Sequence, residues 1–360
     1  MINVTKTYLP EKEKYEAYLG RIFEKGWLTN NGELVQELEA KLTSYLEVPY
    51  LVLTANGTLA LQVAAKLLQL TGEVITTPFT FVATASALAW DNLKIRFSDI
   101  EADSFNLDPL QLGNLINSRT SAIVPVHVYG NICQTEEIAS VAREHGLKVI
   151  YDAAHAFGVK KDGVSAGNFG DISVFSFHST KLFHTIEGGA IVLNSKELYD
   201  KAKLYINFGI AGPEKIPALG INAKMNEFEA AMGLCVFDDL DLIIAGRKKV
   251  YNNYMRELGS LQALRFQKLV EGIEYNYSYF PVVFPDERSL LGVLKEMESH
   301  QIFPRRYFYP SLSTLSYIQH RDAVPVAEDV SKRIACLPLY ENLPESDQQR
   351  IIDIIHKRLA

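Results

Sequence analysis

The sequence predicts an α/β protein with a mostly parallel central sheet flanked by helices, followed by a smaller C-terminal α+β domain. Two observations support this prediction. Short apolar runs typical of fully buried strands alternate with helical patterns through the first two thirds of the chain. The chain has 360 residues, which is enough for one large domain and one smaller domain.

The alternating part of the chain is expected to build the sheet. Predicted strands cover residues 51–54, 73–76, 94–97, 122–126, 148–151, 172–177 and 189–193. Predicted helices cover residues 58–70, 80–90 and 136–145. Because parallel strands need crossover connections, and these connections are helical here, we expect helices on both faces of the sheet.

The last part of the chain is expected to form the second domain. A long helical pattern at residues 225–258 leads into it, and a strand at 277–284 and helices at 289–299 and 345–359 complete it. We place the boundary near residue 245. This gives a large domain of residues 1–245, which includes an N-terminal arm, and a small C-terminal domain of residues 246–360.

Charge and cysteine usage exclude several classes of protein. The net charge of −7 argues against a nucleic-acid-binding protein, whose surface is usually basic. Cys133, Cys235 and Cys336 lack metal-ligand spacing, so no metal site is predicted, and their scatter fits a reducing compartment. The N-terminus lacks the apolar run of a signal peptide, and no apolar stretch is long enough to span a bilayer. We therefore expect a cytoplasmic protein with no membrane partner.

Two ionisable residues follow neighbouring predicted strands. Asp152 ends the strand at 148–151, and Lys181 follows the strand at 172–177. Ligands of open α/β sheets bind in the crevice outside the carboxyl ends of the strands. There a lysine can form a Schiff base with pyridoxal phosphate, while an aspartate keeps the ring nitrogen protonated. Taken singly, Asp152 could instead be a helix cap or a metal ligand, and Lys181 a solvated surface charge.

A strand-to-helix turn at residues 54–61 is a candidate phosphate site. Gly57 permits close approach of the backbone, the helix start supplies free N–H groups, and Thr58 adds a hydroxyl donor. The alternative is an ordinary Asn-Gly turn with a threonine near the helix cap.

Aromatic and basic residues suggest further contacts. Phe81, soon after the second predicted strand, is a candidate to stack on a flat ring, and its alternative is core packing. The basic and aromatic loop at residues 305–310 is a candidate for binding a pyrophosphate and a sugar or base. The alternative for this loop is a strand end with one exposed arginine.

In combination, these motifs resemble the DegT/DnrJ/EryC1/StrS family of sugar aminotransferases. The resemblance rests on Asp-Ala-Ala-His at residues 152–155, on the Ser-Phe, Lys and Glu-Gly-Gly pattern at 176–189, and on the Trp-x-Thr-x-x-Gly element at 27–32. It covers nearly the whole chain and implies a fold type I enzyme that uses pyridoxal 5′-phosphate. The chain departs from the family pattern at Ile186, Ile221 and Lys224, where the family commonly has glycine, tyrosine and arginine.

The resemblance also implies roles for individual residues. Lys181 would be the Schiff-base lysine and proton carrier, Asp152 would pair with the ring nitrogen, and His155 would contact the phenolic oxygen. Gly57, Thr58 and Ser176 would hold the phosphate, and Phe81 would stack on the ring. Implied substrate contacts are Thr29, Arg305 and Tyr307.

One further residue bears on the oligomeric state. Asn222 matches a family asparagine that reaches the cofactor phosphate of the neighbouring subunit, so the resemblance implies a homodimer with shared active sites. The alternative is that Asn222 caps the helix predicted to begin at Met225.

The implied reaction transfers an amino group from glutamate to a nucleotide-linked keto-sugar. Residues 183–187 and 302–310 most resemble enzymes that convert dTDP-4-keto-6-deoxyglucose to dTDP-4-amino-4,6-dideoxyglucose, a sugar for surface polysaccharides such as O-antigen or for natural products. Alternatives are a 3-aminotransferase for a dTDP-3-keto-6-deoxyhexose and a non-catalytic regulator that binds pyridoxal phosphate. A nicotinamide-dependent oxidoreductase would need a Gly-x-Gly-x-x-Gly turn after an early strand, which the sequence lacks.

Overall fold

A seven-stranded sheet forms the centre of the computed structural model, which describes residues 1–359. Its strands, in spatial order, are β2 (Tyr50–Thr54), β10 (Gly189–Leu193), β9 (Ile172–Ser176), β6 (Lys148–Asp152), β5 (Thr120–Val124), β3 (Glu73–Thr76) and β4 (Lys94–Phe97). Strand β10 runs antiparallel to both of its neighbours, and the other pairs are parallel. The predicted mostly parallel α/β sheet is confirmed.

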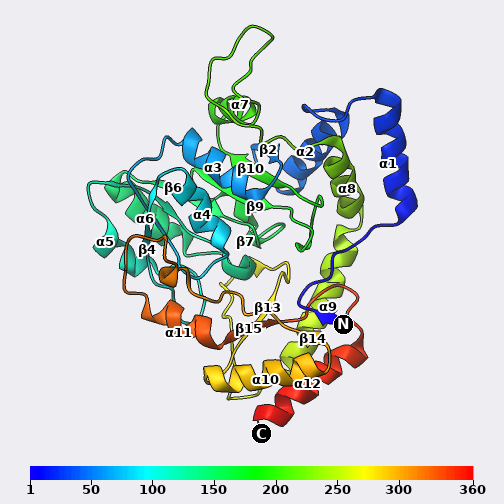
Figure 1. Ribbon diagram of the computed structural model, residues 1–360, viewed down its shortest axis with the longest axis vertical. Helices are drawn as coiled ribbons and strands as arrows, with labels where there is room; N and C mark the ends of the chain where they lie inside the picture. Colours follow the sequence, from blue (N-terminus) through cyan, green and yellow to red (C-terminus); the bar gives the residue numbers. More distant parts are fainter. Residues whose placement is uncertain (360) are drawn as a thin grey trace.

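Helices cover both faces of this sheet (Figure 1). One face packs against α3 (Gly57–Leu67), α4 (Val82–Trp90) and α7 (Lys196–Tyr205). The other face packs against α2 (Glu33–Tyr45), α5 (Leu112–Leu115), α6 (Thr135–His145) and α8 (Glu227–Asp238), with α1 (Lys12–Lys25) outside α8. Because side chains alternate across a strand, Val52 faces the first group of helices, and Leu51 and Leu53 face the second. Burial on both faces explains the continuous apolar runs.

The C-terminal part is built on a second, antiparallel sheet. It contains β11 (Arg265–Phe266), β13 (Phe280–Val283) and β15 (Ile334–Leu337). The helices here are α9 (Leu240–Leu258), α10 (Glu287–Ser299), α11 (Pro325–Arg333) and α12 (Glu345–Leu359). The chain start joins this part, because β1 (Ile2–Asn3) pairs with β14 (Ile302–Phe303). Residue 245 lies inside α9, and the boundary there stays a prediction.

Smaller elements complete the chain. A three-stranded sheet of β12 (Ile273–Glu274), β7 (Lys160–Lys161) and β8 (Val164–Ser165) joins the C-terminal part to the large domain. Short 3-10 helices occur at Pro109–Gln111, Val128–Gly130, Ala166–Asn168 and Leu312–Thr314. No helix within residues 1–359 combines the length and apolar character needed to cross a membrane.

Several expected element boundaries differ from the structure by a few residues, and two of the differences have a clear local cause. The single helix expected at 225–258 is two helices, α8 and α9, which meet at Asp239, where ψ is 8°. Helix α8 begins later than expected because Asn226 and Glu229 cap it reciprocally through side chain and backbone. The strand expected at 277–284 begins only at Phe280, since Tyr277 has a left-handed φ of 56° that interrupts an extended chain.

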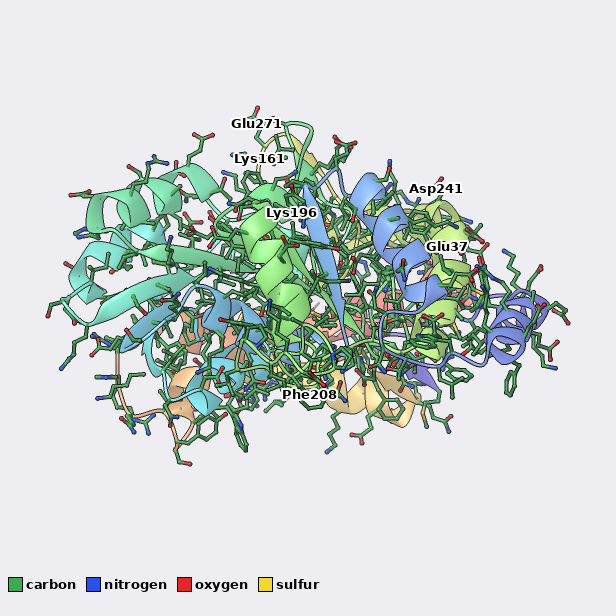
Figure 2. All side chains as sticks on the ribbon, turned by 90° about the horizontal axis from the view of Figure 1, so that it is seen from above. Glu37, Lys161, Lys196, Phe208, Asp241 and Glu271 are labelled. Atoms are coloured by element: carbon green, nitrogen blue, oxygen red, sulfur yellow. The ribbon has the colours of Figure 1, made fainter. Side chains whose placement is uncertain are left out.

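A long loop between α7 and α8 stands away from the rest of the molecule (Figure 1). It folds back on itself, because the N–H of Phe208 donates to the Ile221 carbonyl over 3.1 Å and Ala211 donates to Lys215 over 2.8 Å. Phe208, labelled in Figure 2, and Leu219, which is 86% exposed, are apolar side chains in contact with solvent. The loop therefore presents apolar surface that the chain itself does not cover.

Candidate active site

A cavity of about 370 Å³ lies outside the carboxyl ends of β6 and β9. Because these strands are parallel neighbours, their ends bring Asp152 and the loop that carries Lys181 to the same edge of the sheet. The C-terminal part of the chain closes the opposite wall of the cavity. Predicted site residues that line this cavity are Gly57, Thr58, Phe81, Asp152, His155, Ser176, Lys181, Arg305 and Tyr307.

The start of α3 forms one end of the cavity. Asn56 is the N-cap, and its side-chain oxygen accepts the N–H of Leu59 over 2.9 Å. The first hydrogen bond within the helix is donated by the Ala60 N–H to the Asn56 carbonyl. The N–H groups of Gly57 and Thr58 precede this bond, so they face outward at the positive end of the helix. A Cβ on Gly57 would lie 3.1 Å from the Ser176 Cβ, which is tighter than an ordinary contact. This arrangement suits a phosphate group.

A second glycine lets two backbone segments meet beneath this helix start. A Cβ on Gly189, the first residue of β10, would lie 2.7 Å from the carbonyl carbon of Asn56 and 2.8 Å from the Gly57 nitrogen. No side chain fits at that spacing. The Gly-Gly pair that follows Glu187 therefore allows β10 to pass directly under the N-terminus of α3.

Asp152 lies at the floor of the cavity and is only 5% exposed. Its Oδ2 accepts the hydroxyl proton of Thr84 over 2.7 Å, and its Oδ1 accepts the N–H of Ala154 over 3.0 Å. Burial raises the pKa of the Asp152 carboxyl, whereas the donors from Thr84 and Ala154 and the nearby charge of Lys181 lower it. The site thus holds a desolvated carboxylate, whose ionised form a cationic partner would stabilise strongly.

Lys181 lies on the loop that follows β9. Its N–H donates to the His178 carbonyl over 2.8 Å, and its Nζ lies 5.9 Å from the ring centre of Tyr279. Desolvation by burial lowers the pKa of the Lys181 amine to about 8, and the charge of Asp152 partly opposes that shift. A lysine with this pKa carries a larger neutral fraction near neutral pH, and the neutral amine is the nucleophilic form.

His155 is a buried ring in the cavity wall. Its Nδ1 accepts the N–H of Tyr129 over 3.2 Å, and its ring is parallel to that of Phe308 at 5.9 Å between centroids. Burial, and then the charge of Lys181, lower the pKa of His155 well below its usual value. The ring is therefore neutral and, because Nδ1 accepts, its proton is on Nε2, so Nε2 can act as a donor.

Aromatic and basic side chains line the mouth of the cavity. Phe81 is 52% exposed, which makes the core-packing alternative wrong. The Arg305 guanidinium lies 5.3 Å from the ring centre of Tyr307 and has an exposed side chain, while its backbone pairs with Cys336. Arg306 has a different environment, because it forms an ion pair with Glu287 at 2.7 Å. Arg305 is thus the member of this arginine pair that lines the cavity.

Two predicted site residues lie elsewhere. The described residues that line the cavity include neither Thr29 nor Asn222, and both are exposed. The Asn222 side-chain oxygen accepts from Lys224 Nζ over 2.8 Å. The alternative that Asn222 caps the next helix is wrong, since Asn226 is the N-cap of α8.

Sequence reasoning missed several residues in the cavity wall, namely Thr80, Thr84, His178, Glu187 and Tyr279. The spacing of Thr80 and Thr84 offered a signal, because residues four apart would face the same side of the helix expected at 80–90. In the structure α4 begins at Val82, so Thr80 precedes it. Tyr279 offered none, because it enters from the C-terminal part of the chain. Among residues 1–359, no group of three or more His, Cys, Asp or Glu side chains is arranged to hold a metal ion.

Comparison with known proteins agrees with this geometry. The sequence profile described as the DegT/DnrJ/EryC1/StrS aminotransferase family matches residues 10–356, which is most of the chain. The chain belongs to this family. Aminotransferases of the DegT/DnrJ/EryC1/StrS family depend on pyridoxal 5′-phosphate. The buried carboxylate of Asp152, the desolvated amine of Lys181 and the uncovered N–H groups at the start of α3 fit the ring nitrogen, the aldehyde and the phosphate of this cofactor.

Individual relatives are similar over most of their length. A dTDP-4-amino-4,6-dideoxy-D-glucose transaminase from Shigella dysenteriae is 40% identical, over 99% of this chain and 98% of the relative. A pleiotropic regulatory protein from Geobacillus stearothermophilus is 33% identical, over 90% of this chain and 89% of the relative. The crystal structure of DesI in the presence of its TDP-sugar product superposes with a TM-score of 0.94 at 34% identity, covering 99% of this chain and 93% of that one.

Proposed function

We propose that this aminotransferase moves an amino group from glutamate to dTDP-4-keto-6-deoxyglucose and so makes dTDP-4-amino-4,6-dideoxyglucose. The observation that carries the proposal is the cavity that joins Lys181, Asp152 and the start of α3. The choice of sugar rests on the Shigella dysenteriae transaminase and on the TDP-sugar product named for DesI. The product would serve surface polysaccharides such as O-antigen, and the enzyme would act in the cytoplasm.

The predicted site residues in the cavity have defined tasks in this proposal. Bound pyridoxal 5′-phosphate supplies an electron sink for the electrons released at the substrate carbon. Lys181 is the point of covalent attachment, and its amine then carries a proton to and from the substrate carbon. Asp152 keeps the ring nitrogen protonated, and His155 donates from Nε2 to the phenolic oxygen. Gly57, Thr58 and Ser176 hold the phosphate.

The mouth of the cavity suits a nucleotide-linked sugar. A groove of about 210 Å³ adjoins the cavity, shares Phe81, Arg305 and Tyr307 with it, and also includes Tyr309. A guanidinium beside aromatic rings can bind a pyrophosphate and stack against a base or sugar. Thr29 is kept as a proposed substrate contact, although it lies outside the cavity of a single chain.

We also propose a homodimer in which each subunit completes the other's site. Asn222 would reach the cofactor phosphate of the partner subunit. Support comes from its exposure and from the neighbouring exposed apolar residues Phe208 and Leu219. Apolar surface of this kind is typical of protein–protein contacts. A second chain over the loop would bury it and place Asn222 at the interface.

The direct test is a substrate panel. Purified protein loaded with pyridoxal 5′-phosphate is incubated with glutamate and a set of dTDP- and UDP-linked 3-keto and 4-keto sugars, and products are identified by NMR. Amination at C4 of the dTDP-6-deoxy sugar is expected. Amination at C3 would favour the 3-aminotransferase alternative. Retained cofactor without turnover of any sugar would instead favour a regulator, the description given to the Geobacillus stearothermophilus relative.

A further inference from the structure

We propose that Thr84 is a positioning residue that keeps the Asp152 carboxylate ionised and aimed at the cofactor ring, an inference that rests on the proposed function. Thr84 is the third residue of α4 and is 1% exposed. Its hydroxyl is 2.7 Å from Asp152 Oδ2, although the two residues are 68 positions apart in the sequence. It would act on the reaction through Asp152 and not by touching the substrate.

The carboxylate of Asp152 receives one donor on each oxygen. Thr84 supplies the donor to Oδ2, and the Ala154 N–H supplies the donor to Oδ1. A buried carboxylate is stable as an anion only where hydrogen bonds or positive charge replace the lost water. The two donors also hold the plane of the carboxyl group, because they bind its oxygens from different elements, α4 and the loop after β6.

A second threonine sets the direction of the Thr84 hydroxyl. The hydroxyl oxygens of Thr80 and Thr84 are 3.0 Å apart, and both residues are buried. An ionised carboxylate can only accept, so the single proton of Thr84 points to Asp152, and Thr84 in turn accepts from Thr80. Hydrogen bonds in such a chain polarise one another, so the donor to Asp152 is stronger than that of an isolated hydroxyl.

Thr84 lies in the first turn of α4, so no helical turn precedes it. A threonine deeper in a helix can turn its hydroxyl back to the carbonyl of the preceding turn. Here the Thr84 hydroxyl donates to Asp152, which belongs to another element. The donor lies near the positive end of α4, and this end of the helix also favours a negative charge on Asp152. Lys181 is the charged group that helps to keep the Asp152 carboxyl ionised. The other titratable side chains of the cavity include the neutral ring of His155 and the side chains of His178, Glu187 and Tyr279.

Loss of the Thr84 hydroxyl would therefore change the protonation state of Asp152. With one donor removed, Asp152 would more readily keep a proton, and it could then no longer hold one on the ring nitrogen by charge attraction. Ground-state contacts with glutamate or a keto-sugar would be little affected. The reaction should lose kcat with a nearly unchanged KM.

The test compares Thr84→Val, which keeps the shape, with Thr84→Ser, which keeps the hydroxyl. We expect Thr84→Val to lower kcat of the half-reaction with glutamate about 10- to 100-fold, as removal of a hydrogen bond to a charged group would. KM should change less than about threefold, and the acid limb of the pH profile should move to higher pH. Thr84→Ser should recover most of kcat and the original pH profile.

Two further variants separate chemistry from packing. Thr84→Ala removes the hydroxyl without any risk of overpacking and should behave like Thr84→Val. Thr76→Val is the matched control, because Thr76 is a buried threonine whose hydroxyl donates to the Val124 carbonyl at 2.6 Å, and it should leave kcat and the pH profile unchanged. Thermal unfolding of all variants checks that the fold is intact.

A second readout does not depend on turnover. The affinity of the cofactor-free protein for pyridoxal 5′-phosphate is measured by fluorescence quenching from pH 5.5 to 8. As the pH is lowered, both proteins should lose affinity. Thr84→Val should begin to lose it at a higher pH than the wild type. If the wild-type protein binds the cofactor but turns over no substrate, that result would count against the proposed function. The pH comparison of cofactor affinity would still test the role of Thr84. A folded Thr84→Val variant with normal pH dependence, or Thr84→Ser as impaired as Thr84→Val, would overturn the role of Thr84.

Discussion

The backbone N–H of Tyr129 donates to Nδ1 of His155 over 3.2 Å, and this one contact decides what the imidazole can do in the cavity. Because Nδ1 is occupied as an acceptor, the neutral ring carries its proton on Nε2. Burial lowers the pKa of His155, so the ring stays neutral through the physiological range. The ring thus offers an Nε2–H donor to the cavity, and we propose that this donor binds the phenolic oxygen of the cofactor.

His155 can be tested by replacing the donor. His155→Gln retains an N–H donor and should keep kcat within about tenfold of the wild type, whereas His155→Leu should lose about 1–3 kcal/mol of stabilisation of the bound cofactor. The visible spectrum of the loaded protein and its cofactor dissociation constant measure this loss. Equal behaviour of the two variants would contradict a donor role for His155.

Lys181→Ala should abolish turnover, and borohydride reduction followed by peptide mapping of the wild type should place the label on Lys181. Burial lowers the pKa of the Lys181 amine to about 8 from 10.5, so its neutral fraction is about one half near pH 8 and levels off only above roughly pH 9. The rate of cofactor capture by the cofactor-free protein should follow the same curve. Lys161→Ala is the control and should capture normally. A label on Lys160, Lys161 or Lys224 would overturn the assignment.

Asp152→Asn keeps the shape of the side chain and removes its charge. We expect kcat to fall by at least about 100-fold with fair retention of the cofactor, because removing one partner of a buried charge pair costs about 3 kcal/mol or more. Asp171→Asn is a suitable control, since Asp171 pairs with Lys148 at the opposite end of β6. Near-normal turnover of Asp152→Asn, measured with glutamate under single-turnover conditions, would refute the charge role.

Gly189→Ala should damage the phosphate site. The added Cβ would collide with Asn56 and Gly57, so the start of α3 must shift, at a cost of about 1–3 kcal/mol in the free energy of unfolding. Cofactor affinity should fall with it. In Gly292→Ala the Cβ meets no atom within 4 Å, and a helical alanine should raise stability by at most about 1 kcal/mol. Calorimetry of both variants, with and without cofactor, makes the comparison.

Subunit mixing tests the proposed shared site. Asn222→Ala and Lys181→Ala protein should each be impaired, but a hybrid dimer would place both lesions in one site and leave the other intact. Random exchange should restore up to about a quarter of wild-type activity. Mixing Lys181→Ala with Asp152→Asn is the control, because both residues line the same cavity of one chain and each hybrid site keeps one lesion. Confirmed exchange without recovery in the first mixture would exclude the shared site.

Much of the architecture was predictable from local patterns. A strand buried on both faces needs apolar residues throughout, so runs such as residues 51–53 and 189–193 identify sheet strands. Parallel strands present their carboxyl ends at one edge, so the positions of Asp152 and Lys181 after neighbouring strands predicted that they would meet. Element ends were less predictable, because the capping of α8 by Asn226 and the left-handed φ of Tyr277 depend on single residues.

The sequence by itself thus determined the sheet, its helical cover and the edge at which Asp152 and Lys181 lie, because periodicity along the chain reports which faces are buried. Only the tertiary structure decided which partners surround them. Thr84 donates to Asp152 from another element, and Tyr279 and Arg305 enter the cavity from the C-terminal part of the chain. Such contacts depend on how separate elements pack in space, and the order of residues along one element carries no record of that packing.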